Sequence, residues 1–205
     1  MTRTKLSLSI LLIFICFFTF SQTTDDLFLD GCNFVAQGNY KKAVKCFTKI
    51  IEKDSSYDYA YTNRASCYAL LGKYKKAIPD LNYIINIDPR NLHAYETRGF
   101  ALYEIKKYKL AIKDFNKIIE ISPKSSYAYF QRGLSHQKLK KHTAAIEDFN
   151  KAIKFEPTDS EIYYYRGLSY FKIENYKAAC LDLETAKEMD CSKNNRRMMK
   201  YCNDN

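Results

Sequence analysis

Residues 92–125 read LHAYETRGFALYEIKKYKLAIKDFNKIIEISPKS, and this 34-residue pattern recurs in register along most of the chain. Five places of the pattern carry the same or similar residue types in each copy, and the twentieth is alanine in all five. They are the fourth (Leu27, Tyr61, Tyr95, Tyr129, Tyr163), the eighth (Gly31, Ala65, Gly99, Gly133, Gly167), the seventeenth (Tyr40, Tyr74, Tyr108, His142, Tyr176), the twentieth (Ala43, Ala77, Ala111, Ala145, Ala179) and the twenty-fourth (Phe47, Leu81, Phe115, Phe149, Leu183). A fixed period of this length predicts an array of stacked repeats.

The unit itself predicts two helices joined by a short turn. Tyr95 and Gly99 lie four residues apart and therefore share one face of a helix, and a second helix carries Ala111 and Phe115 at the same spacing. Small residues at the eighth and twentieth places allow the two backbones to approach closely. Pro123 cannot continue the second helix and ends the unit. One such pair cannot bury its apolar face alone, so neighbouring pairs must stack on it.

The pattern resembles the tetratricopeptide repeat, which has an aromatic residue near its start, Gly at the eighth place, Ala and then Phe in the second helix, and Pro near its end. The resemblance implies an all-α fold, a right-handed α-solenoid of five helix-turn-helix repeats with a short C-terminal capping helix. The expected repeats are 24–57 (repeat one, which is divergent), 58–91 (two), 92–125 (three), 126–159 (four) and 160–193 (five), with residues 194–205 as the capping tail.

Residues 1–21 lie outside the repeats and have the layout of a secretory signal peptide. Arg3 and Lys5 precede an apolar run over 6–20, and Ser21 supplies a small residue before a cleavage point at Gln22. Fifteen helical residues span about 22 Å, less than the ~30 Å hydrocarbon core of a bilayer. We therefore expect an exported protein (periplasmic, cell-surface or secreted), with an uncleaved membrane anchor over 6–20 as the alternative.

Export makes disulfide bonds possible. Six cysteines follow the signal segment: Cys32, Cys46, Cys67, Cys180, Cys191 and Cys202. An even number is typical of a disulfide framework, but six cysteines allow 15 connectivities and the sequence does not choose among them. The alternative is that most are small buried apolar residues.

The net charge of +10 comes largely from lysines at the turn between the two helices of each repeat. We call these residues the lysine ridge: Lys41, Lys42, Lys73, Lys75, Lys76, Lys106, Lys107, Lys109, Lys138, Lys140 and Lys141. Stacking would align them along one edge, where they could meet anionic lipid, polysaccharide or an acidic partner. A solvated edge that keeps the chain soluble is the simpler interpretation, and export argues against nucleic acid.

Repeats two to five carry Arg at the seventh place (Arg64, Arg98, Arg132, Arg166) and Asp at the twenty-third (Asp80, Asp114, Asp148, Asp182). Repeat one lacks both residues, which suggests an ion pair inside each later repeat. The alternative is that each Asp pairs with the Arg of the following repeat. Either arrangement would be a structural link between helices.

Other features indicate a structural role rather than chemistry. Pro79 inside the second helix of repeat two predicts a kink or a late helix start over residues 77–80. His93, His136 and His142 have no partner at metal-ligand spacing and are expected to be structural or solvent-facing. The sequence contains no H-E-x-x-H, G-x-S-x-G or glycine-rich phosphate loop. We therefore expect no enzyme, no cofactor and no metal site.

In the family that the chain resembles, the first helix of each repeat lines a concave groove through its second, fifth, sixth, ninth, twelfth and thirteenth places. Carried onto this sequence, these places give the candidate partner-binding residues Tyr59, Asn63, Ser66, His93, Thr97, Phe100, Tyr103, Tyr127, Phe130, Gln131, Leu134, Gln137, Tyr164, Tyr165, Leu168 and Phe171. The basic clamp with which some family members grip chaperone tails is absent, since only Asn63 matches it.

The aromatic residues of repeats three to five suit an extended peptide or an amphipathic helix of another protein. Packing of these rings against neighbouring first helices is the alternative. We therefore expect an exported interaction scaffold that binds a protein segment in its groove. The alternatives are self-association through a terminal segment and a surface-binding module that uses the lysine ridge.

Overall fold

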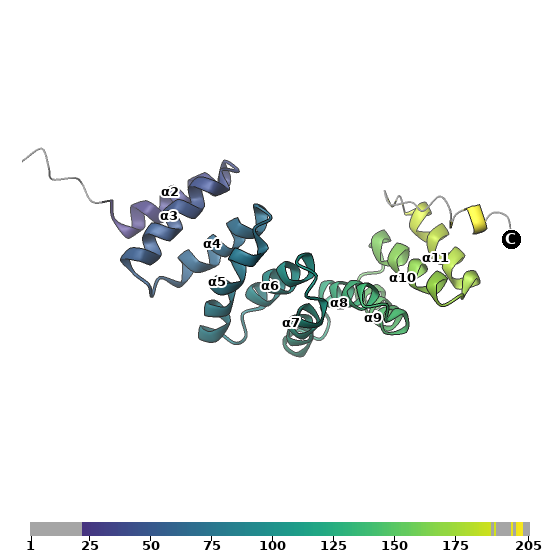
Figure 1. Cartoon of the computed structure of the whole chain (residues 1–205). Helices are drawn as coiled ribbons and strands as arrows, with labels where there is room; N and C mark the ends of the chain where they lie inside the picture. Colours follow the sequence, from purple (N-terminus) through teal and green to yellow (C-terminus); the bar gives the residue numbers. More distant parts are fainter. Residues whose placement is uncertain (1–21, 190, 192–197, 199, 203–205) are drawn as a thin grey trace, which may run out of the picture.

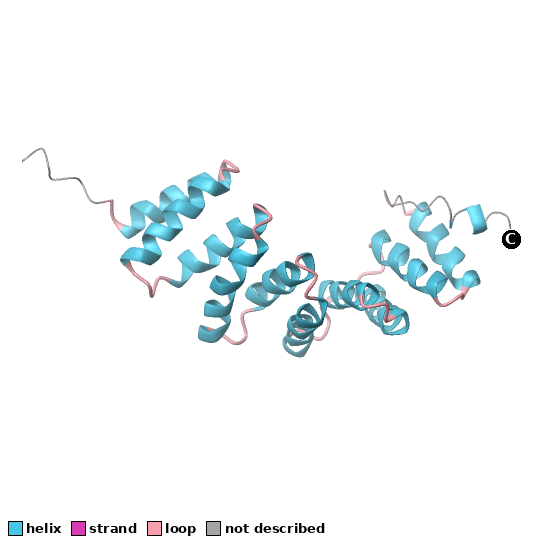
Figure 2. Ribbon diagram, viewed as in Figure 1, coloured by secondary structure: helices cyan, strands magenta, loops and turns pink. Residues whose placement is uncertain are grey.

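The computed structural model describes residues 22–189, 191, 198 and 200–202. Within these residues the regular structure is entirely helical (Figure 2). The ten helices are α2 (Thr24–Ala36), α3 (Tyr40–Lys53), α4 (Asp58–Leu70), α5 (Tyr74–Ile87), α6 (Leu92–Glu104), α7 (Tyr108–Ile121), α8 (Ser126–Lys138), α9 (His142–Phe155), α10 (Ser160–Lys172) and α11 (Tyr176–Glu188). Each repeat contributes one even-numbered first helix and one odd-numbered second helix.

The helix pairs stack in chain order into a long curved array, with α2 at one end and α11 at the other (Figure 1). Each helix packs mainly on its neighbours in the sequence. First helices of adjacent repeats also touch, since α4 contacts α6, α6 contacts α8, and α8 contacts α10. The predicted all-α solenoid is therefore confirmed.

Repeats one, three and four have Gly at the eighth place, where the Phe ring of the second helix lies against it. A Cβ atom added to Gly99 would lie 2.8 Å from Cε1 of Phe115, and one added to Gly133 would lie 2.6 Å from Cε1 of Phe149. Both Phe rings are completely buried, so they have no room to move aside. This contact fixes the spacing of the two helices in repeats one, three and four.

The turn between the two helices has one residue in the left-handed region, at the fifteenth place of every repeat. Repeats one and two have glycine there, with φ of 70° at Gly38 and 67° at Gly72. Repeats three to five have Lys106, Lys140 and Glu174 there, with φ of 64°, 60° and 62°. A side chain in this region costs energy that glycine avoids, so the three later turns are strained.

The Arg and Asp residues form the predicted pair inside each repeat. Nε and Nη2 of Arg98 donate to the two carboxylate oxygens of Asp114 at 2.8 and 2.7 Å, and the pairs in repeats two, four and five are equivalent. This geometry confirms pairing within the repeat and excludes the alternative of pairing with the following repeat.

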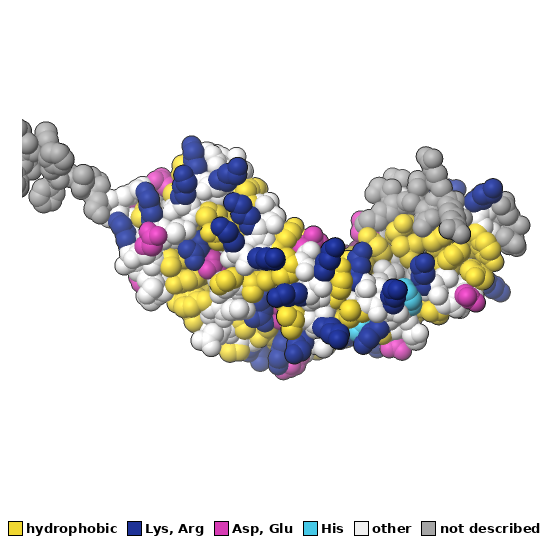
Figure 3. All heavy atoms as spheres, in the orientation of Figure 1, with side chains coloured by type: hydrophobic (Ala, Val, Ile, Leu, Met, Phe, Trp, Pro, Cys, Tyr) yellow, Lys and Arg dark blue, Asp and Glu magenta, His cyan; other side chains and the backbone are white. Residues whose placement is uncertain are grey.

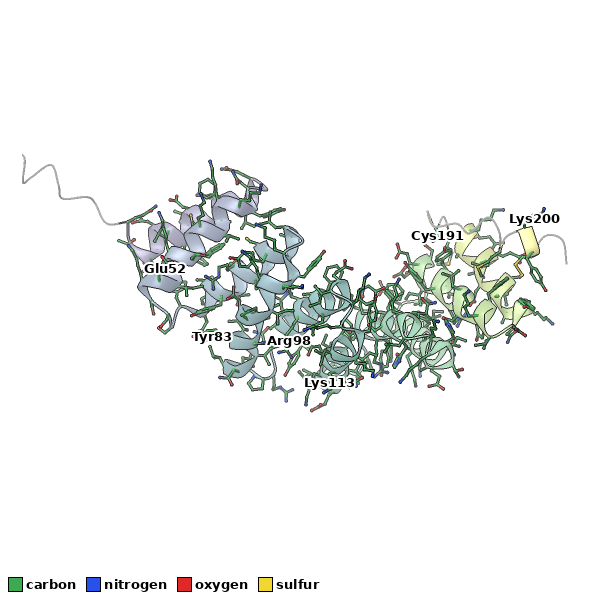
Figure 4. All side chains as sticks on the ribbon, viewed as in Figure 1. Glu52, Tyr83, Arg98, Lys113, Cys191 and Lys200 are labelled. Atoms are coloured by element: carbon green, nitrogen blue, oxygen red, sulfur yellow. A yellow bond between two sulfur atoms is a disulfide. The ribbon has the colours of Figure 1, made fainter. Side chains whose placement is uncertain are left out.

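Each of these Arg residues also donates one hydrogen bond to the preceding repeat. Nη1 of Arg98 donates to Asn82 of the preceding repeat at 2.7 Å, so Arg98 of α6 joins α5 and α7 (Figure 4). Arg132 and Arg166 bond Asn116 and Asn150 in the same way, at 2.6 and 2.7 Å. Each guanidinium also lies over the Tyr of its own fourth place, with centroid distances of 5.3–5.7 Å.

The predicted late start near Pro79 is wrong. Helix α5 begins at Tyr74, the same place at which the other second helices begin, and runs through Pro79 to Ile87. Pro79 is exposed and lies early in the helix. The only bond that it removes would have reached the exposed Lys75, whose carbonyl can bond water instead.

The carboxyl-terminal tail packs on the last repeat. The ring of Tyr201 lies 5.6 Å from that of Phe171 and 4.8 Å from that of Tyr176, and Met198 is buried. A disulfide joins Cys180 of α11 to Cys202. Closing a loop of this length stabilises the folded chain by about 3 kcal/mol. The described tail residues therefore cap the array, while the cysteines at 32, 46, 67 and 191 are free thiols.

Candidate functional site

The candidate site is the surface that the first helices present to solvent at the six places named above, which we call the first-helix face. On a helix, the fourth, seventh and eleventh places lie on the opposite side from these six. Those three places carry Tyr, Arg and another large residue that pack against the second helices. Packing in the repeat core thus turns the six places of the first-helix face away from the second helices.

Large apolar side chains are exposed along this face. Tyr59 is 71% exposed, Phe100 36% and Tyr127 39%. Leu29 and Leu70 are also exposed and occupy the sixth and thirteenth places of repeats one and two. Exposed apolar side chains on the first helices of four successive repeats are typical of a surface that a partner covers.

The rings of the carboxyl-terminal half are packed among themselves. The ring of Phe130 lies 5.9 Å from that of Phe149 and 5.7 Å from that of Tyr165, and Leu134 is buried in the same cluster. Tyr103 packs edge-on against Tyr108 at 5.4 Å, and burial raises its pKa to about 12. The exposed large apolar side chains of the first-helix face therefore lie in repeats one to four, and the described first helix of repeat five presents none.

Other candidates at this end bridge helices. Nε2 of Gln137 donates to the carbonyl of Tyr165 at 2.7 Å and to Oγ of Ser169 at 2.8 Å, which joins α8 to α10. Tyr164 lies against Tyr165, with ring centroids 5.4 Å apart. The two bonds of Gln137 therefore hold repeats four and five together.

The tail covers the last part of the face. A hollow of about 460 Å³ lies between repeats four and five, and Leu168, Phe171 and the tail residue Met198 line it. Because Tyr201 also lies on Phe171, the chain itself occupies the place that a further repeat would take.

The polar candidates are spread over several helices. Nδ2 of Asn63 donates to the carbonyl of Tyr59 at 2.8 Å, and Oγ of Ser66 donates to that of Thr62 at 3.0 Å, so both bond their own helix. His93 is exposed, while Thr97 and Gln131 are half-buried. Leu29 and Leu70 are exposed at two of the six places of this face but are not among the sixteen predicted partner-binding residues.

All the lysines of the lysine ridge are exposed. Figure 3 shows Lys and Arg side chains along the visible face from one end of the array to the other, with few acidic side chains between them. The ridge is therefore a basic surface available to solvent.

The histidines are structural in part. Nδ1 of His136 and of His142 are buried without a hydrogen-bond partner in the described part of the chain, and burial lowers the pKa of both imidazoles. Nε2 of His136 lies 3.8 Å from the carboxylate of Asp148. Among the described residues, no three His, Cys, Asp or Glu side chains are grouped to hold a metal ion.

In the part of the chain that the structure describes, no helix combines the length and the hydrophobicity that crossing a bilayer requires.

Two family models match parts of the chain. One described as "Tetratricopeptide repeat" matches residues 126–159, and one described as "Anaphase-promoting complex, cyclosome, subunit 3" matches residues 36–118. A search of curated proteins gives no match.

Solved structures share the fold. "Crystal structure of MamA protein" has a TM-score of 0.77 at 23% identity, covering 82% of this chain and 92% of that chain. "MamA 41-end from Desulfovibrio magneticus RS-1" has a TM-score of 0.78 at 19% identity, covering 84% and 97%. "Crystal structure of YrrB: a TPR protein with an unusual peptide-binding site" has a TM-score of 0.74 at 18% identity, covering 90% and 93%. At these identities the likeness is one of fold.

Proposed function

Because the chain is a tetratricopeptide repeat protein, we propose that it is an exported, non-catalytic scaffold that binds a segment of another protein on its first-helix face. The observation that carries the proposal is the exposure of Tyr59, Leu70, Phe100 and Tyr127 on successive first helices. Aromatic side chains lose little conformational entropy when covered and contribute much of the affinity at protein interfaces.

The shape of the face favours an extended peptide or an amphipathic helix. A row of apolar side chains on parallel helices provides one anchoring point per repeat, and such segments place apolar residues at regular intervals. One structure of the same fold, YrrB, is described as having a peptide-binding site, which supports this class of ligand.

Peptide selection tests this proposal. Random peptides displayed on phage are selected on the chain spanning residues 22–205, and the selected peptides are titrated against variants by fluorescence anisotropy. We expect Tyr59→Ala combined with Phe100→Ala to weaken binding at least about tenfold, because both side chains lose their contact area. Ile87→Ala is the matched control, since Ile87 is exposed on a second helix.

If the double variant and the control bind the peptides equally and circular dichroism shows both to be folded, the peptides do not bind on the first-helix face. Binding that disappears at moderate salt in all variants would instead favour the lysine ridge, because exposed charges are screened within about 10 Å at 0.1 M salt.

Export is tested separately. Amino-terminal sequencing of the protein recovered outside the cytoplasm should begin at Gln22. A mature chain that still begins at the initiator methionine and stays with the membrane would support the anchor instead.

A further inference from the structure

Two adjoining hollows lie on the other side of α6 from the first-helix face. A hollow of about 660 Å³ lies between α5 and α7, and the buried side chains of Tyr95 and Leu102 form its floor. A smaller hollow of about 420 Å³ adjoins it at the turn edge. Lys107 and Leu110 line both hollows, which joins them into one surface, called here the Leu110 surface.

The Leu110 surface combines positive charge with an exposed apolar side chain. Lysines at positions 106, 107, 109, 113 and 117 surround it, and Leu110 at its centre is 42% exposed. Two acidic residues line it, and both are already paired, Asp114 with Arg98 at 2.7 Å and Glu120 with Lys117 at 2.7 Å.

The remaining ammonium groups have no acidic neighbour in the described structure. No carboxylate of the described residues lies within 4.0 Å of the ammonium groups of Lys107, Lys109 or Lys113, whereas Lys117 lies 2.7 Å from Glu120. A cluster of unneutralised lysines around a hollow raises the local concentration of anionic ligands.

The combination belongs to repeat three and does not follow from the repeat pattern. Repeat three has Leu110 and Lys113 at its nineteenth and twenty-second places. Repeat four has Ala144 and Glu147 at these places, and repeat two has Lys76 and Pro79. Packing of the fold therefore does not require either residue in repeat three.

We propose that the Leu110 surface binds an acidic peptide segment of a partner protein, in which a leucine-like side chain is flanked by Asp or Glu. The apolar side chain would enter the hollow between Leu110 and Leu102, and the flanking carboxylates would meet the ammonium groups of Lys107 and Lys113. Opposite charges around an apolar anchor give both orientation and specificity.

This site is separate from the proposed peptide-binding face. Phe100 lies on the first-helix face of α6, whereas Leu102 lies on the side that meets α5 and α7. One helix would thus serve two ligands on opposite sides, and the chain could hold both at once.

The test uses a fluorescein-labelled synthetic peptide of leucine pairs separated by glutamates, titrated against the chain spanning residues 22–205. Lys113→Glu and Leu110→Ala are informative variants, because each installs the residue that repeat four carries at the same place. Lys151→Glu makes the same charge change at an exposed position of α9 outside the hollow. Circular dichroism checks that every variant is folded.

We expect Lys113→Glu to raise the Kd about tenfold and Leu110→Ala about fivefold, with Lys151→Glu within about twofold of the unchanged chain. Tyr59→Ala with Phe100→Ala should bind this peptide normally, which separates the outcome from that of the first-helix face.

Three results would overturn the proposal. Equal losses for Lys113→Glu and Lys151→Glu would show an effect of net charge alone. Unchanged binding by Leu110→Ala would show that the hollow takes no apolar anchor. Lysine-dependent binding to vesicles with phosphatidylserine, without binding to the peptide, would identify a lipid surface as the ligand instead.

Discussion

The arginine links allow a quantitative prediction in repeat four. Arg132 donates to Asp148 of its own repeat and to Asn116 of the preceding repeat. The side chain of Asp148 is 6% exposed and that of Arg132 is 22% exposed. The change Arg132→Ala removes these donors and leaves a buried carboxylate without its arginine partner.

The expected loss follows from this burial. Breaking a fully buried ion pair costs ~3–5 kcal/mol, and the partial exposure of the guanidinium reduces this to about 2–3 kcal/mol. The change Asp148→Ala leaves an arginine that still reaches water and Asn116, so we expect a loss of about 1–2 kcal/mol. The double variant leaves no buried unpaired charge and should lose about as much as Arg132→Ala alone, roughly 2–3 kcal/mol.

Urea unfolding followed by circular dichroism gives the free energy of unfolding of the unchanged chain, the two single variants and the double variant. Lys151→Ala is the control, because Lys151 is exposed on α9, the helix that carries Asp148. The melting temperature of Arg132→Ala should fall by roughly 5–10 °C, because 1 kcal/mol corresponds to about 2–4 °C in a chain of this size. Losses that add fully in the double variant would show that the two side chains do not act as a pair.

Three further predictions concern the turn, the tail and the histidines. Lys140→Gly should stabilise the chain by about 0.5 kcal/mol, because it removes a side chain from the left-handed region; a lower melting temperature would contradict this. Cys202→Ser should destabilise the chain by about 2–3 kcal/mol in urea unfolding without reductant. Adding reductant should lower the free energy of unfolding of the unchanged chain but not that of the variant. Burial lowers the pKa of His136 and His142 in the folded chain. In the unfolded chain both imidazoles keep the ordinary histidine pKa of ~6.5 and bind protons first as the pH falls. The free energy of unfolding should therefore decrease as the pH drops from about 7 to 5. The double variant His136→Tyr with His142→Tyr should have a stability that depends less on pH. An unchanged pH profile in this variant would show that other groups cause the pH dependence.

Sequence periodicity predicted the fold well because a repeat array depends mainly on contacts between residues close in sequence. The residue types at the fourth, eighth and twenty-fourth places describe one helix pair, and stacking follows from it. The joint absence of Arg and Asp from repeat one predicted their pairing. The bond from Arg132 to Asn116 was missed, although Asn or Thr recurs at the twenty-fifth place of repeats one to four.

The candidate site was less predictable because exposure depends on neighbouring helices. Phe100 and Phe130 are the same residue type on the first helices of adjacent repeats, yet Phe100 is exposed and Phe130 packs against Phe149 and Tyr165. The tail contact with Phe171 could not be derived either, since it depends on one disulfide among several permitted connectivities.

The arginine links also make the two ends of the array unequal. The link between repeats one and two is a bond from Arg64 to the neutral hydroxyl of Thr48, at 3.2 Å, and repeat one has no pair of its own. The other end is tied covalently through Cys202. Unfolding should therefore be vectorial, starting at α2 and α3 and advancing toward the carboxyl end. A force or a protease acting on the amino end would release repeat one first and leave the later repeats folded.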